Sequence, residues 1–149
     1  MCMKALQLAG RIIMENGGET YRVEETVTRM GRAFGLKDVE SFAVPSGVFV
    51  SYEKEDGSHE TAVLRVHRKG INLTRVNAVN QISRQAERGE ITLDGALRAL
   101  QAIEYSTLYT NRQILPAAGI SAAAWAIMFG GGVADFFIAF ATAIVAELL

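Results

Sequence analysis

Residues 17–25 read Gly-Gly-Glu-Thr-Tyr-Arg-Val-Glu-Glu, and this stretch separates two amphipathic patterns at the start of the chain. On its N-terminal side, residues 3–15 carry apolar side chains at helical spacing, and Gly17 is a natural helix stop. On its C-terminal side, apolar residues recur at i, i+4, i+7 and i+11 from Val23 onward, until Gly35. The stretch therefore predicts two consecutive helices joined by a glycine turn.

Three short strands are predicted after the second helix. Residues 39–45 (VESFAVP) and 48–52 (VFVSY) flank the turn Pro45-Ser46-Gly47. Asp56-Gly57 is a strong hairpin signal, and residues 61–66 (TAVLRV) form the returning strand. We predict an antiparallel meander with one face available to helices.

Two further helices complete the predicted N-terminal domain. Asn72 can cap the first of them and Thr92 the second, each followed by apolar residues at helical spacing. The predicted fold class is α+β, with the order ααβββαα and a three-stranded antiparallel sheet. We expect this domain to span residues 1–108 and to lie in the cytoplasm.

Charge is distributed unevenly along the 149 residues. The chain has 15 basic and 16 acidic residues, and beyond Arg112 only Asp135 and Glu147 are charged. The N-terminal part is thus nearly neutral and lacks the basic surface that a nucleic-acid partner requires.

The single cysteine, Cys2, cannot form an internal disulfide, which fits a reducing compartment.

The uncharged C-terminal part predicts a transmembrane region over residues 109–149. About 20 apolar residues in a helix span a bilayer, and the apolar sequence divides at Gly130-Gly131-Gly132 into spans of about 113–129 and 133–149. A buried hairpin of soluble helices is the alternative. Basic residues before the first span orient the N-terminal domain toward the cytoplasm. Since two helices make a poor membrane domain, we expect the chain to be a fragment of a longer protein.

Four segments together resemble the threonine/serine exporter family: GGETYRVEETV, VPSGVFVS, RVHRKGINLTRVNAVNQISR and FGGGVADFFIAF. The resemblance covers nearly all of the chain, in order. It implies a cytoplasmic N-terminal domain followed by a bundle of membrane helices, and export of threonine and serine. A split subgroup pairs such a chain with a separate small membrane protein and is linked to dicarboxylate export. This chain stops after about two of the expected spans.

The resemblance also selects individual residues, one motif at a time. They are Gly18, Glu19, Thr20, Arg22 and Glu24 in the first motif, Pro45, Ser46 and Gly47 in the second, Arg65, Asn72, Leu73, Asn77 and Asn80 in the third, and Gly130, Gly131, Gly132 and Asp135 in the last. Among them, the candidates for substrate binding or coupling are Asp135, Glu19, Thr20, Arg22 and Glu24. The remaining candidates are structural or docking residues: Pro45, Gly47, Arg65, Asn72, Asn77, Asn80, Gly130, Gly131 and Gly132.

The charges of Arg22 and Asp135 need an explanation that the charge of Glu24 does not. Acidic residues in a first helical turn offset the helix dipole, which explains Glu24 without any function. Arg22 is a cation in that unfavourable turn, so we expect a carboxylate partner, either Glu19 or a ligand. Asp135 opens the second predicted span and is either a residue of the loop or a coupling group that faces a helix bundle.

The sequence predicts no enzyme, no cofactor and no metal site. Ser46 lacks the Gly-x-Ser-x-Gly frame of a hydrolase nucleophile. His59 and His67 have no nearby cysteine and no spaced carboxylate motif. The glycines at 130–132 lack the Lys-Ser/Thr ending of a phosphate loop.

The predicted function is that of a subunit or fragment of an exporter of small polar metabolites, either threonine and serine or dicarboxylates, in the bacterial inner membrane. Since no nucleotide-binding motif is present, an ion gradient is the expected driving force. The expected partners are membrane lipid, a small polar substrate, and a second membrane subunit or further copies of the chain. The alternatives are a membrane-anchored hydrolase-like enzyme and a regulatory or adaptor domain of a separate transporter.

Overall fold

The computed structural model describes residues 1–67, 70–106 and 109–148. It divides into two units, Met1–Ser106 and Thr107–Leu149. The first contains α1 (Cys2–Glu15), α2 (Thr20–Ala33), β1 (Lys37–Val44), β2 (Gly47–Glu53), β3 (His59–Arg65), α3 (Leu73–Glu87) and α4 (Leu93–Tyr105), and the second contains α5 (Asn111–Met128) and α6 (Val133–Leu148).

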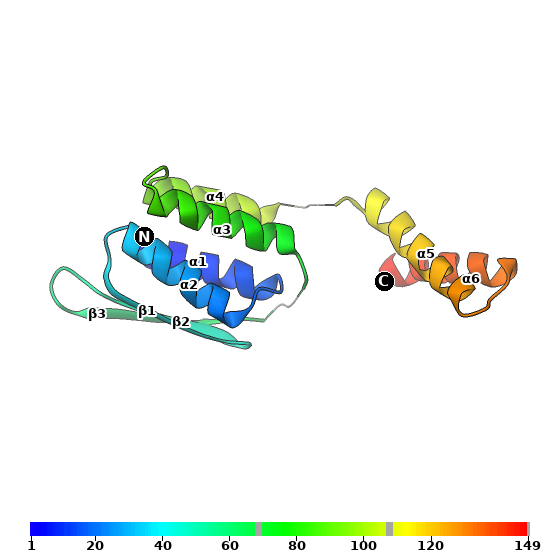
Figure 1. The fold of residues 1–149 in the computed structure, drawn as a ribbon, viewed down its shortest axis with the longest axis horizontal. Coiled ribbons are helices and arrows are strands. Elements are labelled where there is room, and N and C mark those ends of the chain that lie inside the picture. The colour runs from blue at the N-terminus through cyan, green and yellow to red at the C-terminus, as the bar shows by residue number, and fades with distance from the viewer. Residues whose placement is uncertain (68–69, 107–108, 149) are drawn as a thin grey trace. The chain divides into compact units, whose positions relative to one another are not determined.

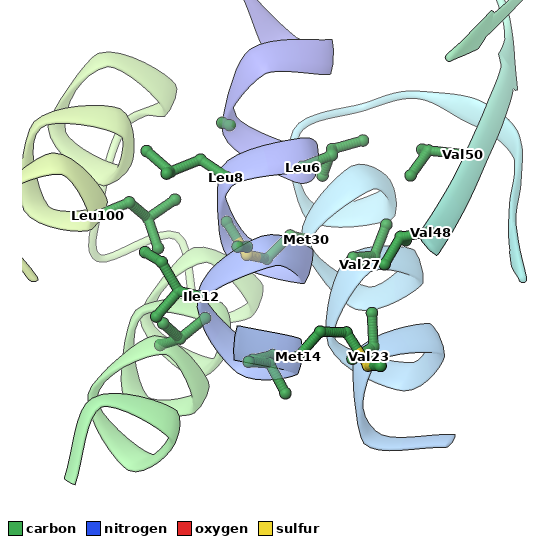
Figure 2. Close-up of a cluster of buried hydrophobic side chains, with 14 of the residues drawn as sticks. Leu6, Leu8, Ile12, Met14, Val23, Val27, Met30, Val48, Val50 and Leu100 are labelled. Atoms are coloured by element: carbon green, nitrogen blue, oxygen red, sulfur yellow. The ribbon is translucent and has the colours of Figure 1, made fainter. Parts of the chain in front are cut away.

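Helix α1 forms the centre of the N-terminal unit. Helices α1 and α2 make a layer between the sheet and the α3–α4 pair (Figure 1). Leu8 and Ile12 point toward Leu100 and the α3–α4 side, while Leu6 lies on the side of the sheet (Figure 2). Because α1 has neighbours on both sides, buried residues cover most of its surface, and only a narrow polar stripe through Lys4, Gln7 and Arg11 is not buried.

The turn between α1 and α2 requires both of its glycines. Gly17 has φ +84°, a conformation that is costly for other residues. A Cβ atom on Gly18 would lie 2.2 Å from Ile13 Cγ2 and 2.9 Å from the Ile13 carbonyl oxygen. The backbone N–H of Gly18 donates to that same oxygen at 2.9 Å. This close approach sets the start of α2 directly against the end of α1.

The sheet has the order β1-β2-β3, and both pairs are antiparallel. Val48, Val50 and Tyr52 of β2 are buried on the face that meets the helices. Phe42 and Phe49 lie on the opposite face and are exposed. This alternation is typical of an antiparallel sheet that packs on one side only.

The two C-terminal helices pack on each other closely. A Cβ atom on Gly119 of α5 would lie 2.6 Å from a ring carbon of Phe140 in α6. Ala123 is buried, whereas no residue of α6 is. The absence of a side chain at Gly119 therefore allows the aromatic ring to approach the α5 backbone.

The fold-class prediction is wrong at this C-terminal end. None of the helices in the described residues is long and apolar enough to cross a membrane, and this finding contradicts the transmembrane spans predicted at 113–129 and 133–149. Helix α6 has 16 residues, or about 24 Å at a rise of 1.5 Å per residue, against a hydrocarbon core of about 30 Å. Helix α5 has 18 residues, but its first turn includes Arg112 and Gln113, and it contains Pro116.

Candidate functional site

Helices α2 and α3 lie side by side and carry polar residues along the groove between them, which we call the α2–α3 groove. A cavity of about 400 Å³ lies where α2 begins, and we call it the Asn77 cavity. Its walls are Gly17, Gly18 and Glu19 from the turn before α2, Arg22 from α2, and Leu73, Val76, Asn77 and Asn80 from α3. The first and third sequence motifs, which are about 50 residues apart in the sequence, thus meet in one place.

Glu19 and Arg22 form an exposed ion pair at the mouth of this cavity. Arg22 Nη2 lies 3.5 Å from Glu19 Oε2 and 3.4 Å from the Tyr21 hydroxyl. Hydrogen bonds from Tyr21 and Arg22 lower the pKa of Glu19, and contacts with Tyr21 and Glu19 raise the pKa of Arg22. The carboxylate partner that the sequence predicted for Arg22 is therefore Glu19, at a distance long enough for a ligand carboxylate to compete.

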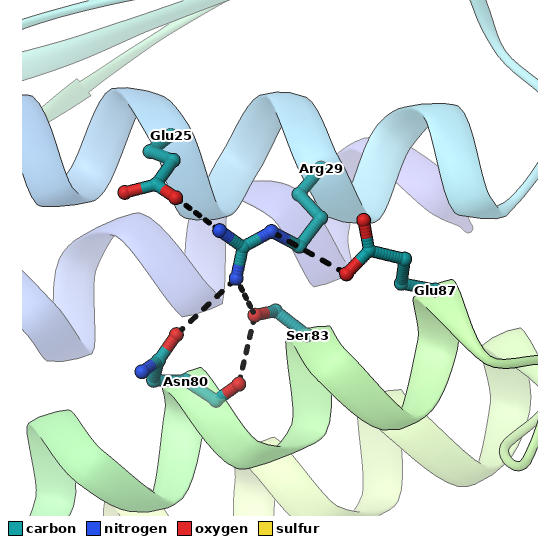
Figure 3. Close-up of polar contacts among 5 residues, drawn as sticks. All are labelled: Glu25, Arg29, Asn80, Ser83 and Glu87. Carbon is teal, nitrogen blue, oxygen red and sulfur yellow. Dashed lines mark hydrogen bonds and ion pairs between the residues drawn. The ribbon is translucent and has the colours of Figure 1, made fainter.

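The next stretch of the groove is closed by Arg29. Its guanidinium lies between Glu25 and Glu87, with the Glu87 carboxylate 3.8 Å from Nε (Figure 3). Nη1 is 3.5 Å from both Asn80 Oδ1 and Ser83 Oγ. Since the Arg29 side chain is only 18% exposed, these contacts fasten α2 to α3 and hold Asn80 at the edge of the Asn77 cavity.

The chemistry of the Asn77 cavity suits a small polar molecule. Arg22 offers hydrogen-bond donors for a carboxylate, and two amide side chains offer both donors and acceptors. Leu73 and Val76 supply apolar wall. The volume lies at the lower end of the range for small-molecule sites, about 300–1,000 Å³.

Two other candidates of the first motif lie elsewhere on α2. Glu24 Oε1 accepts a hydrogen bond of 2.9 Å from the Ala43 backbone N–H. The Glu24 carbonyl accepts a second bond, of 3.0 Å, from Ser41 Oγ. These contacts tie α2 to β1, which gives Glu24 a structural explanation. Thr20 is the half-buried first residue of α2 and does not line the Asn77 cavity.

Asn72 is the N-cap of α3. Its side-chain oxygen accepts from the Arg75 backbone N–H at 3.2 Å. Its own backbone N–H donates to the Asn16 carbonyl at 3.0 Å, and so joins the start of α3 to the end of α1. Asn72 thereby helps to set the position of α3 along the groove.

The second motif lies at the turn between β1 and β2. Pro45 and Ser46 are exposed turn residues, and Gly47 is buried opposite Arg65 of β3. A Cβ atom on Gly47 would lie 3.0 Å from the Leu64 carbonyl oxygen. Pro45, Gly47 and Arg65 therefore gather at one end of the sheet, away from the Asn77 cavity.

The last motif forms the turn of the C-terminal unit. Gly130 has φ +89°, and a Cβ atom on Gly131 would lie 2.8 Å from the Ala126 carbonyl oxygen. Asp135 Oδ2 accepts from the Gly132 backbone N–H at 2.8 Å. A carboxylate at the third helical position that binds the N-cap N–H is half of a capping box, so this contact explains Asp135 as a helix-start residue.

The described residues contain no group of three or more His, Cys, Asp or Glu side chains that could hold a metal ion. Ser46 Oγ lies at an exposed turn, and His59 and His67 are also exposed. The predicted absence of a metal or cofactor rests on the sequence alone.

The sequence analysis missed two groove residues, Ser83 and Glu87, and the contact of Arg29 with α3. The pairing of Glu25 with Arg29 follows from helical spacing, but the reach of Arg29 to α3 depends on how the two helices pack. Ser83 is fully buried within an otherwise apolar face of α3. The signal available for Ser83 was its place as a small polar residue on a buried helical face.

Comparisons with known proteins agree on one family. The ThrE family model, described as "Putative threonine/serine exporter", matches residues 4–149. The "Probable succinate transporter subunit YjjP" of Escherichia coli strain K12 is 28% identical over 123 residues, which is 83% of this chain and 47% of that protein. The protein with the same description in Klebsiella aerogenes is 37% identical over 75 residues, or 50% of this chain and 29% of that protein. The chain thus spans at most about half the length of these curated relatives. No solved structure matches it significantly.

Proposed function

The chain belongs to the threonine/serine exporter family, and from this premise we propose that it is a component of a membrane exporter of small polar metabolites. The observation that carries the proposal is the extent of the family match, which takes in both units of the chain. Two relatives described as succinate transporter subunits support the same role.

The Asn77 cavity is the proposed contact site for the exported solute. Arg22 would bind a carboxylate of the solute, and Asn77 and Asn80 would bind its other polar groups. Two substrate classes fit these side chains, and Glu19 distinguishes between them. In a site for threonine or serine, Glu19 pairs with the ammonium group of the solute. In a site for dicarboxylates, Glu19 competes with the solute for Arg22.

The proposal places the exporter in the bacterial inner membrane, in contact with lipid, and the N-terminal unit on the cytoplasmic side. A second membrane subunit completes the exporter, in keeping with the word "subunit" in the relatives' descriptions. An ion gradient drives export, and the chain itself catalyses no reaction. Accordingly, Ser46→Ala should leave export unchanged.

The test is an efflux assay in bacterial cells from which the gene for this chain has been deleted. Succinate and threonine are measured inside and outside the cells by mass spectrometry, with and without the gene restored in its native genetic context. We expect export of one solute class to depend on the gene at equal growth. Unchanged levels of both solutes would contradict the proposal.

Groove variants then test the site at equal protein abundance. Arg22→Gln should reduce export of either substrate class about tenfold, the scale of one lost charge-assisted hydrogen bond. Glu19→Gln should reduce export of threonine but increase export of succinate. Arg98→Gln is the matched control, because Arg98 is an exposed arginine on α4 outside the groove. If Arg22→Gln behaves like this control, the Asn77 cavity is not the solute site.

A further inference from the structure

The face of the sheet that points away from the helices carries an apolar row across all three strands. Phe42 of β1 pairs in register with Phe49 of β2, and Phe49 pairs with Val63 of β3. These side chains are 60%, 41% and 62% exposed, respectively. The two phenyl rings lie 6.1 Å apart, centroid to centroid. We call the surface around this row the outer sheet face.

Opposite charges lie on either side of the apolar row. Arg65 ends β3 in the same pairing row as Val44 and Gly47, whereas Glu40 lies on β1 in the row of Ser51 and Thr61. At about 4.8 Å between strands and 3.4 Å per residue, their Cα atoms are about 17 Å apart along a diagonal of the face. That distance is too long for an ion pair within one chain. Neither residue takes part in any of the ion pairs found among the described residues.

We propose that the outer sheet face is the interface of a symmetric dimer of this chain, in which Glu40 of each copy pairs with Arg65 of the other. In a two-fold interface, if residue i contacts residue j of the partner, then j contacts i. The two-fold axis lies in the plane of the interface and is perpendicular to the Glu40–Arg65 diagonal at its midpoint. Rotation about this axis brings Glu40 of each copy onto Arg65 of the other and places the two apolar rows against each other. The strands of the two copies then cross at roughly 70°, near the orthogonal class of sheet packing.

Charge complementarity favours a second copy over a lipid surface as the occupant. Anionic membranes attract surfaces that carry basic residues throughout. The outer sheet face instead carries Glu40 as well as Arg65, and Glu53 follows Phe49 and Ser51 on the same side of β2. Glu40 and Arg65 complement each other under two-fold rotation, which a lipid surface does not require.

The outer sheet face is small for a protein interface. Three strands of about seven residues cover roughly 14 Å by 24 Å, or about 340 Å² of flat area. A standard interface buries about 800 Å² per partner. We therefore expect a weak dimer, with a Kd on the order of tens to hundreds of micromolar.

The test measures self-association of the full chain by sedimentation equilibrium from about 10 µM to about 1 mM, concentrations that bracket the affinity expected for a small interface. Phe49→Ser should raise the Kd at least tenfold, because it removes the central aromatic contact. Ile71→Ser is the matched control, since Ile71 is an exposed apolar residue outside the sheet. Circular dichroism verifies that each variant is folded.

Charge reversal provides the decisive result. Glu40→Arg alone and Arg65→Glu alone each bring like charges together twice, and each should raise the Kd at least tenfold. An equimolar mixture of the two variants restores both opposite-charge pairs, so it should form a heterodimer with a Kd within about threefold of the wild-type value. A monomeric wild-type chain would overturn the proposal. Self-association that is insensitive to Phe49→Ser would also overturn the proposal, and it is the result expected if the α5–α6 hairpin were the contact. A mixture of the Glu40→Arg and Arg65→Glu variants that stays monomeric would overturn the proposal as well.

Discussion

Helices α1 and α6 belong to different units and differ in burial. The simple expectation that the more apolar helix is the more buried one fails for this pair. Helix α6 is the more apolar of the two, yet it has no buried residue. Helix α1 includes Lys4, Gln7 and Arg11, yet most of its residues are buried. The difference lies in their neighbours, because α1 contacts α2, α3, α4 and the sheet, whereas α6 packs on α5. Burial is thus a property of the packing around a helix and not of its hydropathy.

Leu6→Ala tests this comparison with the largest expected effect. Leu6 is fully buried in α1, so removal of its side chain should lower the free energy of unfolding of the N-terminal unit by about 2–5 kcal/mol. Ile138→Ala on α6 is the matched control, because Ile138 is 64% exposed and its truncation should cost less than about 0.5 kcal/mol. Urea unfolding followed by circular dichroism measures both.

The single tryptophan allows the two units to be followed separately in the same experiment. Trp125 lies in α5 and stacks on Phe129, with 5.8 Å between ring centroids. Leu6→Ala should therefore shift the circular dichroism transition and leave the tryptophan fluorescence transition in place. A coincident shift of both transitions would mean that the two units unfold as one.

Gly18→Ala should have the next largest effect. The added methyl group would meet Ile13 Cγ2 at 2.2 Å and the Ile13 carbonyl oxygen at 2.9 Å. A backbone contact cannot be relieved by a side-chain rotation, so we expect a loss of about 2–3 kcal/mol from overpacking. Gly70→Ala is the control, since its nearest atom would be 3.7 Å away. Equal melting temperatures for the two variants would refute the close approach of α1 and α2.

Alkaline pH should destabilise the N-terminal unit selectively through Tyr52. Burial, together with the neighbouring Glu60, raises the pKa of Tyr52 from 10.0 to about 12. Between these two values the unfolded chain loses the phenol proton while the folded chain keeps it. The stabilising effect is complete below pH 10, and about 1–2 kcal/mol is lost as the pH rises to 12.

Tyr52→Phe isolates this titration from the other groups that ionise in the same range. The difference in unfolding free energy between wild type and Tyr52→Phe should shrink from pH 9 to pH 12. The unfolding transition of the C-terminal unit, followed by Trp125 fluorescence, should be the same in wild type and Tyr52→Phe at each pH. A difference that is constant with pH would show that Tyr52 is not responsible.

Gly119→Ala is the corresponding change in the C-terminal unit, with the smallest expected effect. The new methyl group would lie 2.6 Å from the Phe140 ring. Because an aromatic side chain on a half-buried position can turn away, we expect a loss of about 1 kcal/mol. The Trp125 transition should shift and the circular dichroism transition of the N-terminal unit should not. Ser121→Ala, at an exposed position of α5, is the control.

Local chemistry explains which elements were predictable from the sequence. Helix ends at Gly17 and Gly35, caps at Asn72 and Thr92, and the Asp56-Gly57 turn all act within a few residues. The order of helices and strands in the first 105 residues follows from such signals, and it agrees with the structure. The transmembrane prediction failed because it counted uncharged residues, whereas crossing a bilayer depends on the length and composition of a continuous helix.

The candidate site could be predicted only in part. The motif residues Glu19, Arg22, Asn77 and Asn80 were named from the resemblance, but nothing in the sequence brings residue 22 beside residue 77. Their meeting in the Asn77 cavity depends on the packing of α2 against α3. Similarly, Glu24 belongs to the same motif as Arg22 and yet serves the β1 strand.

By itself, the sequence determined the family and the local signals that start and end most elements, because these depend on residue types at short spacing. The tertiary structure alone decided which apolar helix is buried, which charged residues of one motif share a cavity, and where the exposed phenylalanines align. Those outcomes depend on contacts between residues far apart in the chain, and the free energy of such contacts comes from packing that no single segment encodes.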